Sequence, residues 1–181
     1  VNAARYLFRE EPRWVMATAE TGQGGRRFRA IDEQVTAILG FPGGKTAAFT
    51  CSYGATDVAV YEVYGTNGYV CLDNAYEFST GMKLEVGVGE KSRSRRFLKR
   101  DQVAPELEHF ADCVRSGREP EPSGKEGLID VQIIEAILRS AATGRRVDLR
   151  VPRRRRRPTL RQERTVRGHR KPRLVRAATP F

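Results

Sequence analysis

The 181-residue sequence is poor in cysteine and has no long apolar run. Its three cysteines, Cys51, Cys71 and Cys113, include no C-x-x-C pair, and an odd number cannot close a disulfide framework. Reduced thiols in a cytoplasmic protein are therefore expected. No apolar stretch approaches the roughly 20 residues that a membrane-spanning helix needs, so no membrane partner is expected. The chain starts without methionine inside an expected helix, so a targeting segment cannot be judged.

Histidine is almost absent as well. His109 is the only one before residue 152, and no further ligands are spaced on its face of the expected helix, which favours a helix-surface residue over a metal ligand or a base. The possible nucleophiles Ser52, Ser79 and Cys51 lack a matching histidine and acid. The sequence therefore predicts no catalytic residue and no metal site in this chain.

The glycine clusters do not have the setting of a dinucleotide site. They fall at 22–25, 43–44 and 87–89, each between two expected strands. A dinucleotide cradle needs a Gly-rich turn that leads from a strand into a helix, where backbone N–H groups meet the pyrophosphate. We therefore expect no cofactor to be bound by this chain alone.

The net charge of +11 belongs to one end of the chain. Residues 152–181 contain twelve of the 33 basic residues and one of the 22 acidic residues, which leaves 21 of each in residues 1–151. Such a tail is expected to be disordered and could bind nucleic acid by counterion release. Against this, Phe181 is its only aromatic residue, so it has no stacking platform. A GC-rich gene read out of frame would produce a similar arginine-rich composition.

Residues 1–151 read as one domain with an ordered succession of elements. A short helix is expected over 2–8 and a strand over 13–20. A hairpin follows, formed by strands at 34–41 and 46–53 across Pro42-Gly43-Gly44. A second hairpin joins 58–64 to 69–73 through Asn67-Gly68, a strong turn signal, and weaker strands are expected at 82–88 and 95–98.

Two amphipathic helices and a short strand at 147–149 close the domain. The first runs from Pro105 to a stop at Gly117, with its apolar stripe on Leu107, Phe110, Ala111 and Val114. The second starts at a Ser123–Glu126 capping box and ends near Gly144. Its expected core stripe is Leu128, Val131, Ile134, Leu138 and Ala141. The predicted fold is α+β: an open-faced, mainly antiparallel sheet of five to six strands with helices on one face, followed by the disordered basic tail.

The uncovered face of this sheet has an unusual composition. It would present small, mildly polar residues, namely Thr36, Thr46, Thr50 and Ser52. The sequence leaves two interpretations open, a solvated face or a surface that another molecule covers.

Several motifs together resemble one enzyme family. They are NAARYLF at 2–8 with Glu11-Pro12, YGTNGY at 64–69, LEHFADCV at 107–114, PSGKEGL at 122–128 and IEAIL at 134–138, with Ser140 and Thr143-Gly144-Arg145. Their order and spacing over residues 1–151 are similar to the C-terminal domain of the Gfo/Idh/MocA oxidoreductases, the glucose–fructose oxidoreductase and inositol dehydrogenase superfamily.

The resemblance implies a division of labour. The family's NAD(P)-binding domain, with a catalytic lysine in a Glu-Lys-Pro motif, lies N-terminal to this region, and its Tyr or His partner would fall just before Val1. This chain would then be the substrate-pocket and oligomerisation part of an enzyme for a sugar, polyol or related hydroxyl substrate, inactive by itself. Its open sheet face would join subunits, and Asn2, Arg5 and Lys83 are the candidate substrate-binding residues. The alternative is a non-enzymatic module that self-associates and binds nucleic acid through its tail.

Overall fold

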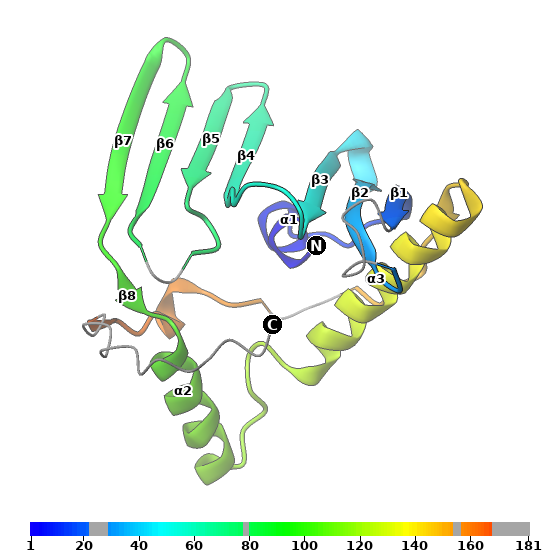
Figure 1. Cartoon of the computed structure of the whole chain (residues 1–181). Helices are drawn as coiled ribbons and strands as arrows, with labels where there is room; N and C mark the ends of the chain where they lie inside the picture. The colour runs from blue at the N-terminus through cyan, green and yellow to red at the C-terminus, as the bar shows by residue number, and fades with distance from the viewer. Residues whose placement is uncertain (22–28, 78–79, 154–156, 168–181) are drawn as a thin grey trace, which may run out of the picture. The chain divides into compact units, whose positions relative to one another are not determined.

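The computed structural model describes residues 1–21, 29–77, 80–153 and 157–167. The chain forms two compact units (Figure 1). The first unit comprises Val1–Thr56 and Glu119–Leu160, and the second comprises Asp57–Arg118 and the chain from Arg161 onward. Each unit has its own antiparallel sheet, described separately below.

The first unit is a four-stranded sheet with the order β3-β2-β1-β9. Its elements are α1 (Asn2–Phe8), β1 (Trp14–Thr21), β2 (Asp32–Gly40), the 3-10 turn η2 (Pro42–Gly44), β3 (Thr46–Ser52), α3 (Gly124–Thr143) and β9 (Val147–Asp148). The predicted helix at 2–8 and the predicted hairpin are confirmed, with Thr36 opposite Thr50 across β2 and β3. The glycines of η2 adopt positive φ, which lets the chain reverse within three residues.

Helix α3 covers one face of this sheet, as Figure 1 shows. Alternate strand residues point toward it and form the core with the inner side of the helix: Val15, Ala17, Ala37, Leu39, Phe41, Ile129, Ile133, Ala136 and Ile137. The ring of Phe8 on α1 packs edge-on against Phe41 at 4.9 Å. Ser140 is also fully buried; its Oγ accepts a hydrogen bond from the N–H of Ala17 and donates one to the carbonyl of Arg145. A hydroxyl thus ties the end of α3 to β1.

The predicted core stripe of α3 was wrong. Leu128, Val131, Ile134 and Leu138 are 46–58% exposed, whereas the neighbouring stripe through Ile129, Ile133, Ala136 and Ser140 is buried. Both stripes have helical spacing, so periodicity alone did not distinguish them. The sheet packs against the stripe that carries the small residues, which let the backbones approach and bring the Ser140 hydroxyl to β1.

The second unit contains another four-stranded antiparallel sheet with the order β4-β5-β6-β7. Its elements are β4 (Val60–Gly65), β5 (Gly68–Asp73), β6 (Met82–Val88), β7 (Lys91–Phe97), β8 (Arg100–Asp101), α2 (Val103–Ser116) and β10 (Val166–Arg167); η3 (Leu160–Gln162) lies at the boundary of the two units. The Asn67-Gly68 hairpin is confirmed, with Tyr64 opposite Tyr69. Strand β7 is longer than predicted, because its exposed Lys-Ser-Arg-Ser-Arg-Arg sequence has no apolar alternation and is held by backbone pairing with β6.

Helix α2 ends as predicted, with Gly117 in the left-handed conformation at φ 63°. It begins two residues earlier than expected, because Asp101 Oδ1 accepts hydrogen bonds from the N–H groups of Val103 and Ala104 at 2.9 Å. Among the described residues, no helix combines the length and apolar character that crossing a bilayer requires.

The α+β class with antiparallel sheets is confirmed, but the described strands form two four-stranded sheets and the short β8–β10 pair rather than one sheet of five to six strands. Within the tail that was predicted to be disordered, the structure describes residues 157–167. There Arg157 and Arg164 form ion pairs, and Val166 pairs with Asp101. Residues 154–156 and 168–181 of the tail lie outside the described residues.

Candidate functional site

A buried ionic cluster in the first unit is centred on Arg5, whose side chain is completely inaccessible to solvent. Its Nε donates to Glu11 Oε2 at 2.5 Å and its Nη1 donates to Asp130 Oδ1 at 2.7 Å. The same Nη1 lies 3.0 Å from Glu126 Oε1. Three carboxylates from two parts of the chain therefore surround one guanidinium and join α1 to α3.

Local structure brings these groups together. Arg9 ends α1 in the left-handed conformation, with φ 55°, and this turn directs the following segment back so that Glu11 reaches Arg5. Glu126 and Asp130 are four residues apart on α3, and such residues share one face of a helix. The Glu11-Pro12 segment that the sequence marked as the end of the first helix is thus also part of the cluster.

Glu126 does not have the role that its position predicts. Ser123 is the N-cap residue of α3, but its side chain makes no capping hydrogen bond. Glu126 is buried and its Oε1 faces Arg5 and Asn2 instead. A hydrogen bond to a charged group contributes about 1.5–3 kcal/mol, against about 1 kcal/mol for a helix cap, so the buried guanidinium is the stronger partner. The boundary was predicted correctly and the capping box was wrong.

Arg157 completes the cluster, and sequence reasoning missed it because it belongs to the basic tail. Its Nη1 donates to the carbonyl oxygen of Arg5 at 2.7 Å, and its Nη2 donates to Glu11 Oε1 at 3.2 Å. Its side chain is only 10% exposed. Among the described residues, two guanidiniums therefore contact the three carboxylates of the cluster.

The environment of Arg5 suits a structural role. Burial alone would lower the pKa of Arg5, but hydrogen bonds from its guanidinium to Glu11 and Asp130 outweigh burial and raise it. Arg5 is therefore permanently charged, and its Nη2 has no hydrogen-bond partner among the described residues. Substrate binding by Arg5 stays a prediction, but a substrate would have to displace packed protein to reach this side chain.

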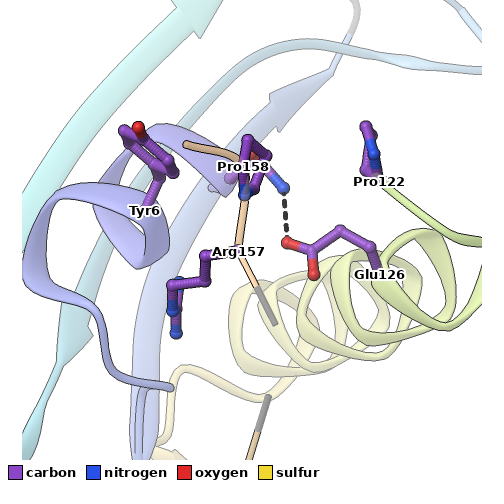
Figure 2. Close-up of a pocket in the computed structure, with 6 residues that line it drawn as sticks. Tyr6, Pro122, Glu126, Arg157 and Pro158 are labelled. Carbon is purple, nitrogen blue, oxygen red and sulfur yellow. Dashed lines mark hydrogen bonds between the residues drawn. The ribbon is translucent and has the colours of Figure 1, made fainter. Parts of the chain in front are cut away.

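A small hollow lies beside the cluster (Figure 2). It measures about 50 Å³ and is lined by Asn2, Tyr6, Pro122, Glu126, Arg157 and Pro158. Asn2 Nδ2 donates to Glu126 Oε1 and to Asp130 Oδ2, both at 2.9 Å. Ligand pockets usually measure about 300–1,000 Å³, so this hollow has room for a few water molecules and not for a sugar. Substrate binding by Asn2, which is exposed at its rim, stays a prediction.

The third predicted residue, Lys83, lies on β6 in the second unit. Its side chain is 48% exposed, with Nζ 3.9 Å from Glu85 Oε2. On the same face of the sheet, the hydroxyl of Tyr69 donates to Glu85 Oε1 at 2.6 Å, a hydrogen bond that raises the pKa of Tyr69. Burial, followed by the negative charge of Glu62, raises the pKa of the Cys71 thiol and disfavours its reactive thiolate. Lys83 is thus accessible beside hydrogen-bonded polar groups, and its contact with substrate also stays a prediction.

The remaining polar groups give no sign of a metal centre. His109 lies on α2, as predicted, with Nε2 3.6 Å from Cys113 Sγ. Over the described ranges, no group of three His, Cys, Asp or Glu residues has the arrangement of a metal site.

The face of the first sheet that is opposite α3 is exposed. The hydroxyl oxygens of Thr36 and Thr50 are hydrogen-bonded at 3.0 Å. This contact is expected for two threonines that lie on the same face of neighbouring strands. The sequence interpretation missed an apolar row beside them, in which Met16 pairs with Ile38 and Ile38 with Ala48. Met16 is 48% exposed and Ile38 is 41% exposed, which is high for apolar residues at the centre of a sheet.

These features define an α+β domain with a helix on one face of its first antiparallel sheet and an exposed opposite face. Among the described elements, no Gly-rich turn leads from a strand into a helix. The chain belongs to the Gfo/Idh/MocA oxidoreductase family: the model for "Oxidoreductase family, C-terminal alpha/beta domain" matches residues 1–149.

Characterised relatives agree with this assignment. The chain is 29% identical over 144 residues to a D-xylose 1-dehydrogenase [NADP(+)] of Haloarcula marismortui, covering 79% of this chain and 39% of that enzyme. It is 31% identical over 154 residues to an inositol 2-dehydrogenase of Rhizobium meliloti, covering 82% of this chain and 46% of that enzyme. An aldose-aldose oxidoreductase from Caulobacter crescentus, crystallised with glycerol, superposes with a TM-score of 0.74 at 35% identity, covering 82% of this chain and 44% of that one. The chain therefore spans less than half the length of these relatives.

Proposed function

We propose that this chain supplies the substrate-side and assembly part of an NAD(P)-dependent oxidoreductase that acts on a sugar, a polyol or a related hydroxyl compound. The observation that carries the proposal is the family match over residues 1–149. It is supported by relatives whose names specify xylose, inositol and aldose substrates. By itself the chain is not expected to turn over substrate.

The cofactor would be held by a part of the enzyme that this sequence does not contain. Gly43 and Gly44 lie in η2 between two strands, Gly87 lies inside β6, and Gly89 lies in the β6–β7 turn. The cluster at 22–25 lies outside the described residues. This chain would contribute groups that contact a hydroxylated substrate, with Asn2 and Lys83 the accessible candidates.

The assembly role rests on the exposed face of the first sheet. Its apolar row of Met16, Ile38 and Ala48 lies beside the bonded threonines, and exposed apolar patches of this kind commonly mark contact surfaces. We propose that a second copy of the chain covers this face. The three cysteines are all free, as expected for the reducing cytoplasm in which we place the enzyme.

Two experiments test these proposals separately. Sequencing the gene upstream of the Val1 codon, followed by a nicotinamide absorbance assay with a panel of sugars and polyols, tests the enzyme. An in-frame dinucleotide-binding region and activity of the extended protein support it, whereas turnover by the 181-residue chain alone contradicts the division of labour.

Light scattering of the purified chain tests the assembly. Ile38→Asp should convert an oligomer into a monomer, because it places a charge in the apolar row. Gln132→Asp, at an exposed position of α3 on the other side of the sheet, is the matched charge control and should leave the oligomer intact. A wild-type chain that is monomeric at every concentration would refute self-association through this face.

The alternative, a nucleic-acid-binding tail, would have to use arginines other than Arg157 and Arg164. Arg157 and Arg164 are paired with carboxylates of the body, so their charges are not free for phosphates. Salt-dependent retention of an oligonucleotide that disappears on deleting residues 152–181 would restore that alternative.

A further inference from the structure

The described residues of the basic tail make contacts with the body at two places. Arg157 enters the Arg5 cluster of the first unit, and residues 163–166 contact β8 and α2 of the second unit. The family match ends at residue 149, so this segment is a feature of the chain that the family does not account for. The composition predicted a disordered basic tail here, whereas the described residues of the tail contact both units.

The first attachment is buried and two-pronged. One N–H of the Arg157 guanidinium binds a backbone carbonyl and another binds Glu11, whose side chain is 7% exposed. Such forked contacts use the planar geometry of arginine, which a lysine cannot reproduce. Removing this cation would take from Glu11 one of the two guanidiniums that contact it among the described residues.

The second attachment is more exposed and combines charge with backbone pairing. Arg164 Nη2 lies 2.7 Å from Asp112 Oδ2, and its Nη1 lies 3.7 Å from Glu108 Oε2. Glu163 Oε1 lies 3.3 Å from Arg100 Nη1, and Val166 is paired with Asp101 in an antiparallel bridge. Hydrogen bonds from Arg164 and Arg115 lower the pKa of Asp112 to about 2.

We propose that residues 157–167 are a strap built into the fold, in which Arg157 and Arg164 act as two ionic latches that hold the start of the basic tail on the body. The latches differ in strength. The carboxylates and guanidinium of the Arg164 latch are 33–61% exposed, whereas those of the Arg157 latch are 7–10% exposed. Exposed ion pairs are screened by salt and buried ones much less so, and the strap should therefore release stepwise, Arg164 first. This inference does not depend on the proposed enzymatic function.

Limited trypsin digestion read by mass spectrometry tests the strap on the full chain. The informative bond follows Arg161, which is exposed and lies between the two latches. Its cleavage rate reports how often the strap opens. In wild-type protein this cleavage should accelerate at least tenfold as salt rises from about 0.1 M to about 1 M, where the Debye length falls from about 10 Å to about 3 Å. Arg164→Gln should reach the fast rate already at low salt.

Matched variants separate the latch from general charge effects. Arg153→Gln removes the same charge from an exposed arginine that makes no ion pair with described residues, and its cleavage after Arg161 should equal that of wild type. Arg157→Gln should cleave at least tenfold faster, and Arg157→Lys should lie between the two because it keeps the charge but loses the fork. If Arg157→Gln fails to fold, as judged by Trp14 fluorescence, the cleavage rates of Arg164→Gln and of wild type at the two salt concentrations still test whether the strap forms. Equally fast cleavage of wild type, Arg164→Gln and Arg153→Gln at low salt would show a free arm and overturn the proposal.

Discussion

Replacing Arg5 with methionine should destabilise the first unit by about 3–5 kcal/mol, the usual cost of removing one partner from a buried ionic group. Methionine retains most of the length and apolar packing of the side chain, so the loss is mainly electrostatic. Glu11 and Glu126, each 7% exposed, would lose the Arg5 counter-ion, one of the two cations that the described part of the cluster contains. Asp130 is 22% exposed, so water can partly solvate its carboxylate once the guanidinium is gone.

Urea unfolding followed by tryptophan fluorescence measures this effect. Trp14 is the only tryptophan and lies on β1, with the Arg146 guanidinium 4.8 Å from its ring centroid, so its emission reports on the first unit. With an m-value of about 2 kcal/mol/M, a loss of 4 kcal/mol lowers the urea midpoint by about 2 M. Arg5→Lys should give a smaller loss, because it keeps the charge and loses the fork.

A control variant and a double-mutant cycle make the result interpretable. Arg13→Met removes the same charge from an exposed arginine whose side chain has no ion pair among the described residues, and should change stability by about 0.5 kcal/mol or less. Arg5→Met in a Glu126→Gln background should cost less than in wild type, with a coupling of about 0.5–3 kcal/mol. If Arg5→Met and Arg13→Met had the same midpoint, the cluster would not contribute to stability and the electrostatic reasoning would be refuted.

Three further predictions concern single positions. Gly40→Ala should lower stability by about 1–3 kcal/mol and shift Trp14 emission, because the new methyl group would overlap the indole ring; unchanged emission would contradict this contact. Gly127→Ala should raise the free energy of unfolding by about 0.5–1 kcal/mol, since its methyl group enters open space on α3, and thermal unfolding measures it. The Asp112 carboxyl should titrate at about pH 2 by carbon NMR and nearer its usual 3.8 in Arg164→Gln. Because the folded-state pKa is depressed, this ion pair contributes fully above about pH 4 and is lost as the pH falls toward 2, and an Asp112 midpoint unaffected by Arg164→Gln would show that the latch does not form.

The parts of this protein that local sequence specified are those whose signals lie within a few residues of one another. The helix at 2–8, the turns at Pro42–Gly44 and Asn67-Gly68, and the helix stop at Gly117 formed where expected. Each depends on backbone conformations that glycine, proline or asparagine favours locally, or on apolar periodicity. The family resemblance, carried by short motifs in order, was likewise readable from the sequence and is confirmed.

Tertiary structure decided the features for which local signals allowed more than one outcome. Helix α3 has two apolar stripes of helical spacing, and only packing against β1 selected the one with Ala136 and Ser140. Glu126 satisfies the sequence rule for a capping box, but a buried guanidinium competes for it more strongly than a helix terminus does.

The ionic cluster shows the same limit over a longer range. Asn2 meets Glu126 across 124 positions of sequence, and Arg157 meets Arg5 across 152. By itself the sequence determined most of the longer elements, the α+β class and the neutral charge of residues 1–151, because these follow from neighbouring residues and composition. Only the folded chain decided which arginines became buried counter-ions, because burial and charge pairing depend on groups that are distant in sequence and adjacent in space.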